Sequence, residues 1–245
     1  MHAQNLVKTS QLITTKDGSH TLWVPSLKET YHSTHGALQE SKHVFIEHGL
    51  LHWLKHHAGP SIKILEVGLG TGLNVLLTYL ALLTKPVETV YTGLEPYPVP
   101  WEYVPCFNYA AQLTQEQGCP ITYEALQATF EKLHQSGGTS FCKLADYFSL
   151  QKLRLPLATF SAPPCTFDVV YFDAFSPSKQ PGLWKMPLLR KVGWMMKNDG
   201  IMVTYCAQGR FKNHLKQLGM HVETLTGPPG KREMTRASWC SERIE

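Results

Sequence analysis

The sequence lacks long apolar runs, paired cysteines and a high density of charge. No stretch reaches the roughly 18 consecutive apolar residues of a membrane-spanning helix, and residues 1–15 lack the basic start and apolar block of a secretory signal. The six cysteines are scattered, with no Cys-x-x-Cys pair, so neither a disulfide framework nor a cysteine-ligated zinc site is indicated. We therefore expect a cytoplasmic protein that has reduced thiols and does not associate with membranes.

The 245 residues are 43% hydrophobic and 17% charged, a composition that allows one sizeable globular core. Residues 1–178 hold 11 basic and 14 acidic side chains, a net charge of −3, whereas residues 179–245 hold 12 basic and 5 acidic side chains, a net charge of +7. A basic C-terminal segment suits a polyanionic partner such as a nucleic acid. A solvated basic face with no partner is the alternative interpretation.

Hydrophobic patterning predicts strands that alternate with helices. An N-terminal β-hairpin is expected around Asp17-Gly18, because this dipeptide favours a tight turn between two β-prone runs. Helices are expected at 41–57, 73–83, 183–196 and 210–218, strands at 62–67, 89–94, 167–172 and 200–206, and a second hairpin at 222–239. This alternation predicts an α/β fold with a mostly parallel sheet. We divide the chain into an N-terminal extension (1–40) and a main domain (41–245).

A glycine-rich turn joins the first core strand to its helix and reads Glu66-Val-Gly68-Leu-Gly70-Thr-Gly72-Leu-Asn74. Glycines let a ligand approach the backbone there, and the start of the helix presents free N–H groups. A dinucleotide fingerprint would need its third glycine at position 73, which is a leucine, so a nicotinamide oxidoreductase is disfavoured. The acidic-Gly-x-Gly-x-Gly spacing is instead typical of class I methyltransferases that bind S-adenosylmethionine (SAM).

Carboxylates follow at positions where a ribose-bearing, cationic cofactor would need them. Glu95 ends the second strand and is expected to accept hydrogen bonds from ribose hydroxyls. Asp146 is expected at the end of a third strand, beside the adenine amino group. Either residue could instead be a capping or surface acid. The predicted cofactor site thus comprises Glu95 and Asp146 together with five residues of the glycine turn: Glu66, Gly68, Gly70, Gly72 and Asn74.

An apolar strand at 167–172 places Asp173 at the same sheet edge, followed by Phe175 and Pro177. A protonated amine has no free electron pair, so an amine substrate must lose a proton before it attacks the sulfonium methyl group. Asp173 is therefore the predicted catalytic residue, which takes or holds that proton, while Phe175 forms a pocket wall. A helix N-cap is the alternative role for Asp173.

Further motifs make the sequence particular. They comprise Thr30-Tyr31, Gly36-Ala-Leu38 with Glu40, the glycine turn, Asp173-Ala-Phe-Ser-Pro177 with Lys179 and Trp184, and Gly230-Lys231-Arg232-Glu-Met234. In these motifs the chain resembles the tRNA 5-aminomethyl(-2-thio)uridine methyltransferases, the family of the N-terminal domain of the bifunctional MnmC and of stand-alone MnmD. The glycine turn is shared by very many methyltransferases, whereas the Asp-x-Phe-x-Pro-x-Lys string and the Lys-Arg-Glu-Met ending are far more specific.

The resemblance implies a class I, Rossmann-like methyltransferase fold with a seven-stranded, mostly parallel sheet and an N-terminal β-hairpin extension. It implies methyl transfer from SAM to the exocyclic amine of 5-aminomethyl(-2-thio)uridine at the tRNA wobble position, which gives the 5-methylaminomethyl form. The tRNA anticodon arm would be the partner, contacted by Lys231 and Arg232, and Tyr31, Phe175 or Trp184 would stack on the splayed wobble base. Pro177 and Lys179 complete the predicted substrate site.

Other functions stay open. A methyl or aminopropyl transferase that acts on a small-molecule amine would share the fold without needing a basic face, and a silent RNA-binding module would keep the fold without binding SAM. No FAD is expected, because no second glycine fingerprint is present. No metal is expected either: His48, His52 and His56 fall on one helix face beside Glu47, but neither a His-Glu-x-x-His motif nor a cysteine accompanies them.

Overall fold

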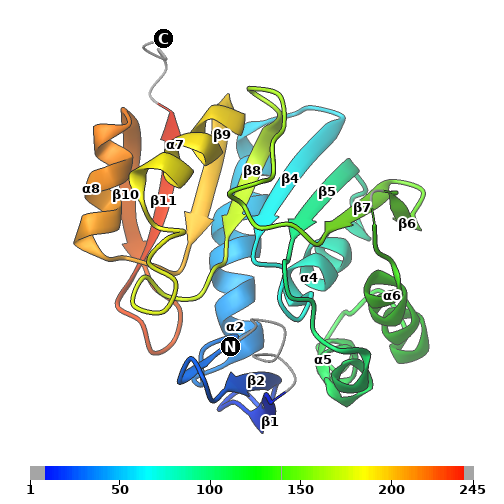
Figure 1. Cartoon of the computed structure of the whole chain (residues 1–245). Coiled ribbons are helices and arrows are strands. Elements are labelled where there is room, and N and C mark those ends of the chain that lie inside the picture. The colour runs from blue at the N-terminus through cyan, green and yellow to red at the C-terminus, as the bar shows by residue number, and fades with distance from the viewer. Residues whose placement is uncertain (1–8, 139, 240–245) are drawn as a thin grey trace.

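An eight-stranded sheet forms the centre of the computed structural model, which describes residues 9–138 and 140–239 (Figure 1). The strand order is β10-β11-β9-β8-β4-β5-β7-β6. The five strands from β9 to β7 run parallel to one another, as the alternating sequence pattern predicted. Residues 1–8 and 240–245, the outer ends of the two predicted domains, lie outside the described residues.

The elements follow the predicted alternation, with bounds that differ by a few residues. The strands of the main sheet are β4 (Ser61–Val67), β5 (Glu88–Leu94), β6 (Cys142–Ala145), β7 (Phe148–Leu153), β8 (Phe167–Phe172), β9 (Met196–Thr204), β10 (Met220–Thr226) and β11 (Glu233–Trp239). The α-helices are α2 (Ala37–Ser41), α3 (His52–His56), α4 (Leu73–Leu82), α5 (Tyr109–Thr114), α6 (Tyr123–Gln135), α7 (Met186–Met195) and α8 (Gly209–Gln217). A π-helix, η1 (Lys42–Leu51), joins α2 to α3, and a 3-10 helix, η2 (Trp101–Cys106), precedes α5.

Alternate side chains of the central strands enter two separate cores. Ile64 and Tyr171 pack on one face with Leu76 of α4, whereas the neighbouring Leu65 and Phe172 belong to the other core. The second core is covered by α7 and α8. Successive residues of a strand point to opposite faces, so strands that are apolar on both sides are the expected consequence of helices on both sides. No helix within residues 9–138 and 140–239 is long and apolar enough to span a membrane.

The N-terminal extension forms its own antiparallel sheet of β1 (Gln11–Thr14), β2 (His20–Val24) and the short β3 (Glu29–Thr30). The hairpin turn lies at the predicted Asp17-Gly18, where Gly18 has a φ of 83° and the Asp17 carboxylate accepts a hydrogen bond from Ser19 N at 3.0 Å. Figure 1 shows this sheet beneath the end of the main sheet to which β4 and β8 point. The division of the chain at residue 40 falls inside α2 and stays a prediction.

The main sheet has one strand more than the seven predicted. The additional strand is β7, for which no strand was predicted from the sequence. The predicted third strand that ends at Asp146 is β6, which is short, forms the edge of the sheet and pairs antiparallel with β7. Asp146 lies in the exposed turn between β6 and β7. The start of β7 pairs with the start of β5, so this turn lies at the end of the sheet where the parallel strands begin. The glycine turn lies at the other end, where the parallel strands finish.

Candidate active site

A cavity of about 430 Å³ opens at the carboxyl ends of the parallel strands. Open α/β sheets bind their ligands at this edge, and the volume lies in the range of small-molecule sites. Its walls come from the ends of β4, β5 and β8, from the N-terminal extension and from the loop after β7. Six residues of the predicted site line it: Tyr31, Gly68, Gly70, Glu95, Asp173 and Phe175.

The glycine turn brings backbone close to backbone. Gly68 has a φ of 93°, and a Cβ at this position would collide with the carbonyl oxygen of Asp173. A Cβ at Gly70 would lie 2.9 Å from the ring of Tyr31. Both glycines therefore allow the β4–α4 turn to pack directly against other walls of the cavity. Gly72 instead faces α6, away from the cavity lining, and precedes the first residue of α4.

Glu95 links the glycine turn to the end of β5. Its carboxylate accepts hydrogen bonds from Gly70 N at 3.0 Å and from Tyr97 N at 2.9 Å. Burial raises the pKa of Glu95 to about 7, although both hydrogen bonds favour the charged form. A buried carboxylate in this cavity can accept hydrogen bonds from hydroxyl groups or neutralise a cationic ligand. The contact of Glu95 with the ribose hydroxyls stays a prediction.

Glu66 occupies a different place from the other predicted cofactor residues. It is fully buried within β4 and does not line the cavity. Its carboxylate accepts hydrogen bonds from Asn74 Nδ2 at 2.8 Å and from Tyr91 Oη at 2.8 Å. Burial, and next the charge of Asp173, raise the pKa of Glu66 well above its usual value. Glu66 therefore orients Asn74 rather than facing the cavity itself.

Asn74 joins Glu66 to Asp173. The same amide nitrogen that donates to Glu66 also lies 2.9 Å from Asp173 Oδ2. Burial, and next the negative charge of Glu40, raise the pKa of Asp173 to about 7, while the bond from Asn74 and the positive charge of Lys231 oppose the shift. A carboxyl group with such a pKa can exchange a proton near neutral pH.

The loop 173–176 is fixed by a hydrogen bond at each residue. These bonds are Asp173 N to Val67 O (2.9 Å), Tyr205 Oη to Ala174 O (2.8 Å), Trp184 Nε1 to Phe175 O (2.9 Å) and Ser176 Oγ to Glu29 Oε2 (2.9 Å). The rings of Phe175 and Tyr31 meet edge to face, with centroids 5.1 Å apart. The catalytic candidate thus lies on a preorganised loop, beside two aromatic side chains.

Trp184 is not placed to stack on a substrate base, so this part of the prediction was wrong. Its side chain is 4% exposed and packs between Phe172 and Phe211, with ring centroids 4.9 and 5.0 Å away. The tryptophan instead supports the loop through its hydrogen bond to Phe175 O. Pro177 and Lys179 lie further along the same loop and are not among the residues that line the cavity.

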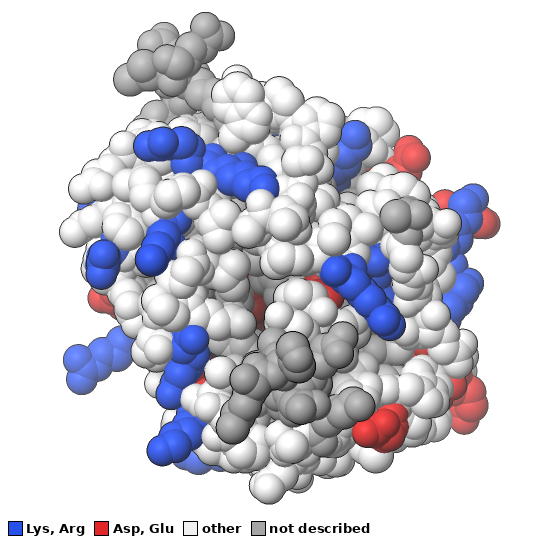
Figure 2. Space-filling view, viewed as in Figure 1, with Lys and Arg blue, Asp and Glu red and all other residues white. Residues whose placement is uncertain are grey.

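Lys231 has protein partners on both sides. Its ammonium group forms an ion pair with the buried carboxylate of Glu40 and lies 3.8 Å from the centre of the Tyr205 ring. These contacts hold its charge near Asp173, whose pKa it lowers. The predicted role as a tRNA backbone contact therefore fits Lys231 less well than its exposed neighbour Arg232. Figure 2 shows further Lys and Arg side chains over the half of the molecule that contains α7, α8, β10 and β11.

Asp146 is too far from this cavity to serve the cofactor, because its turn lies at the opposite sheet edge. The prediction assumed that the strand before Asp146 runs parallel to its neighbours. The loop that follows β7, with Leu155, Pro156 and Leu157, lines the cavity instead. This apolar wall was not predicted from the sequence, in which Glu40 stands out only as part of a motif. A single buried glutamate beside Ala37 and Leu38 gives no local signal of its distant partner.

The sequence of this chain is similar to those of known methyltransferases. A family model described as "S-adenosyl-L-methionine-dependent methyltransferase" matches residues 152–239. The bifunctional protein MnmC of Ralstonia nicotianae, named for tRNA 5-methylaminomethyl-2-thiouridine biosynthesis, is 28% identical over 225 residues, which cover 86% of this chain and 32% of that protein. The MnmC of Idiomarina loihiensis is 28% identical over 228 residues, or 88% of this chain and 36% of that protein. The chain thus spans about a third of the length of these curated relatives.

The fold also matches a solved structure. The crystal structure of MNMC2 from Aquifex aeolicus superposes with a TM-score of 0.72, covers 95% of this chain and 71% of that chain, and is 23% identical in sequence. This likeness confirms the predicted class I methyltransferase fold. The sequence matches confirm the family resemblance that the motifs indicated.

Proposed function

We propose that this chain is a SAM-dependent methyltransferase that modifies tRNA at the wobble uridine, because it is similar to the MnmC proteins over most of its length and a methyltransferase family model matches residues 152–239. The reaction is transfer of the methyl group of SAM to the exocyclic amine of 5-aminomethyl(-2-thio)uridine, which gives the 5-methylaminomethyl form. The bifunctional relatives are about three times as long as this chain, so their full activity is not carried over.

The position of Asp173 is the observation that supports this reaction best. Its carboxyl group lines the cavity, directly beside the glycine turn, and has a pKa of about 7. Asn74 occupies Oδ2, which leaves Oδ1 for an amine nitrogen. An acid fixed in this way suits a nucleophile that must lose a proton near neutral pH.

The residues around the cavity fit SAM. Glu95 provides a carboxylate for the ribose hydroxyls, Leu155 and Leu157 provide an apolar wall for the adenine, and Gly68 and Gly70 place the backbone of the β4–α4 turn in the cavity wall. Bound SAM supplies a methyl group on a positively charged sulfur, which an amine can attack. The carboxyl group of Glu95 favours a cation in this environment once it is ionised.

The chain's own residues then handle the amine and its proton. The nitrogen electron pair forms the new C–N bond while the C–S bond breaks and its electrons stay on sulfur. The nitrogen must lose one proton overall, and Oδ1 of Asp173 holds or accepts it. Tyr31 and Phe175 form an aromatic corner against which an unstacked base can pack, so that the amine is directed at Asp173.

The anticodon arm of tRNA is the proposed partner, and its wobble base lies in a single-stranded loop that can enter a cavity without breaking a duplex. Exposed basic residues such as Arg210, Lys216 and Arg232 are the proposed phosphate contacts.

Mass analysis of nucleosides tests the proposal. Undermodified tRNA with free aminomethyl groups is incubated with the protein and isotope-labelled SAM, and labelled 5-methylaminomethyl nucleoside is the expected product. Free polyamines and amino acids serve as competing acceptors in parallel reactions. Labelled small amines with unlabelled tRNA would favour the small-molecule transferase. Absence of SAM binding in calorimetry would favour the silent RNA-binding module.

A further inference from the structure

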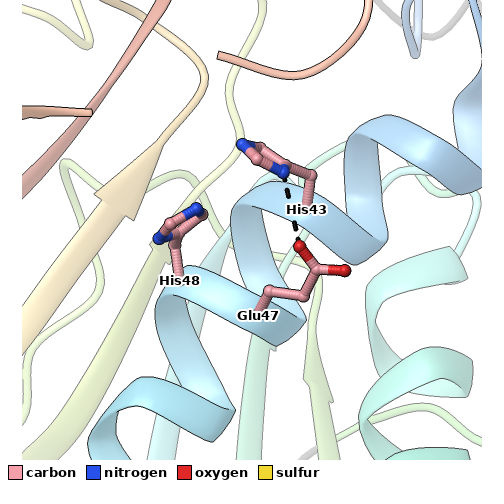
Figure 3. A group of neighbouring side chains, drawn as sticks. All are labelled: His43, Glu47 and His48. Atoms are coloured by element: carbon pink, nitrogen blue, oxygen red, sulfur yellow. Dashed lines mark ion pairs between the residues drawn. The ribbon is translucent and has the colours of Figure 1, made fainter. Parts of the chain in front are cut away.

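A second group of ligand-type side chains lies on η1, outside the candidate active site. His43, Glu47 and His48 each offer one nitrogen or oxygen atom, and these atoms all lie within 4.8 Å of one another. The rings of His43 and His48 are 4.6 Å apart. Figure 3 shows the three side chains extending from consecutive turns of the same helix toward one another. None of them lines the cavity.

The helix type explains why these three residues share a face. In a π-helix the hydrogen bonds run from residue i to i+5, so side chains five positions apart come closer than in an α-helix. Residue 43 is therefore a neighbour of both residue 47 and residue 48. In an α-helix, by contrast, His48 would share a face with His52 and His56, the grouping expected from the sequence. Within the described part of the chain, only the His43 group brings three such residues together.

His43 is already oriented as a metal ligand. Its Nε2 lies 2.9 Å from the backbone oxygen of Thr226, and a carbonyl oxygen can only accept, so Nε2 carries the hydrogen. Nδ1 is then the atom that can bind a metal, and it lies 3.3 Å from Glu47 Oε2. Histidines that bind metals commonly donate their second N–H to a carbonyl or carboxylate in this way, which fixes the ring.

The surroundings do not oppose a cation. The Glu47 side chain is 59% exposed, so an ion can reach the group from solvent. Arg236, a positive charge near His48, is neutralised by a two-point ion pair with Glu223, with N–O distances of 2.7 and 2.9 Å.

We propose that His43 Nδ1, the Glu47 carboxylate and a ring nitrogen of His48 bind one divalent transition-metal ion of the zinc type. Two imidazoles and one carboxylate are a ligand set that zinc, cobalt and nickel accept, and water would complete the coordination. This proposal departs from the expectation of no metal, and it does not depend on the proposed methyl transfer.

The site has a structural consequence through Thr226. This residue ends β10 and directly precedes the turn 227–232, which carries Lys231 to Glu40. A metal that fixes the His43 ring also fixes its hydrogen bond to Thr226. The ion would thereby hold the C-terminal hairpin against η1, as a clamp outside the cavity.

Titration of metal-free protein tests the site. The full chain is dialysed against a chelator and titrated with zinc chloride in a calorimeter, and with cobalt chloride while visible absorption reports the coordination geometry. We expect one ion per chain. The double variant His43→Ala plus His48→Ala should bind at least about tenfold more weakly. Absence of saturable binding in the unaltered protein would overturn the proposal.

A matched control comes from the same helix region. His52 and His56 also form a ring pair, with centroids 4.5 Å apart, but among the described residues they belong to no group of three ligand-type side chains. The double variant His52→Ala plus His56→Ala should keep the affinity of the unaltered protein, and an equal loss in both double variants would overturn the assignment. Alanine suits a helix, and circular dichroism of each variant verifies folding. Hydrogen exchange of residues 227–232 should slow on zinc addition, and unchanged exchange would overturn the clamp.

Discussion

Among the described residues that line the cavity, Asp173 and Glu95 are the two with carboxyl groups, and burial raises the pKa of each to about 7. They differ in their partners. Glu95 is held by two backbone N–H groups, whereas Asp173 is held by one side-chain amide and is acted on by the opposite charges of Glu40 and Lys231. Glu95 is therefore suited to binding and Asp173 to proton handling.

Asp173→Asn should lower kcat by about a hundredfold or more, because the amide is nearly the same shape but cannot take a proton from the amine. SAM affinity should change little, since the backbone of the loop is held independently of this side chain. Single-turnover methylation of tRNA and SAM calorimetry measure the two quantities. Undiminished turnover would remove Asp173 from the mechanism.

Glu95→Gln should change how stability depends on pH. The pKa of Glu95 is about 7 in the folded protein and about 4.5 when it is unperturbed, so between these values the folded state keeps a proton that the unfolded chain releases. Glu95 therefore makes the folded protein less stable as pH rises from about 4.5 to about 7. Urea unfolding of the SAM-free protein across this range should show a smaller decline in the variant.

Comparing the pH dependence of stability in the unaltered protein and in Glu95→Gln separates the effect of Glu95 from that of groups that make the fold more stable as pH rises. Burial lowers the pKa of His32 to about 4, so protonation of the unfolded chain destabilises the fold as pH falls below about 6.5. Identical pH profiles for the two proteins would show that Glu95 does not retain its proton.

Helix α2 and the β10–β11 hairpin meet at the ion pair of Glu40 and Lys231, which are 191 positions apart in the sequence. Their charges act on Asp173 with opposite signs. Lys231→Met should raise the pKa of Asp173 and move the acidic limb of the kcat–pH profile to higher pH, whereas Glu40→Gln should move it to lower pH. Stopped-time assays from pH 5.5 to about 9 would measure both shifts.

Lys212→Met is the matched control for this pair. Lys212 also forms an ion pair with a residue of the hairpin, Glu233 at 3.0 Å, but it does not act on Asp173. Removal of the Lys212 charge should leave the acidic limb of the kcat–pH profile at the same pH. Shifts of Lys231→Met and Glu40→Gln in the same direction would contradict the electrostatic account.

Local patterns predicted the elements that form the cavity. Three glycines after a buried strand specify the β4–α4 turn, and the apolar run before Asp173 specifies β8. The direction of a strand is not encoded in this way, because β6 and β7 show similar alternation and only the turn at Asp146 decides that they are antiparallel. The burial of Trp184 was equally hidden, since it depends on Phe172 and Phe211 from other elements.

Charge is distributed unevenly over the molecule, with a net +7 in residues 179–245. If tRNA is the substrate, its affinity should fall steeply with salt, because each phosphate contact releases a counterion. Arg232→Ala should reduce the slope of log Kd against log salt by about 0.7 to 0.9, the effect of roughly one contact. Filter binding with tRNA at several salt concentrations measures the slope.

Two further variants sharpen this measurement. Lys231→Ala should change the slope less than Arg232→Ala, because Lys231 is paired with Glu40. Lys55 is exposed near the end of α3, shortly before β4 starts at the opposite sheet edge, so Lys55→Ala should have no effect. An equal reduction of the salt slope in all three variants would indicate that tRNA responds to the overall positive charge of the protein rather than to individual phosphate contacts.

The order of strands has a consequence for synthesis on the ribosome. β11 lies between β9 and β10, although it follows both along the chain. A nascent chain that has emerged only as far as β10 therefore exposes the unpaired edge of β9, because the partner of β9 in the folded sheet is β11 and not β10. Glu40 emerges early but meets Lys231 only when the hairpin is made. Translation must pass residue 239 before the enzyme can close its sheet, so truncated chains should be prone to aggregate.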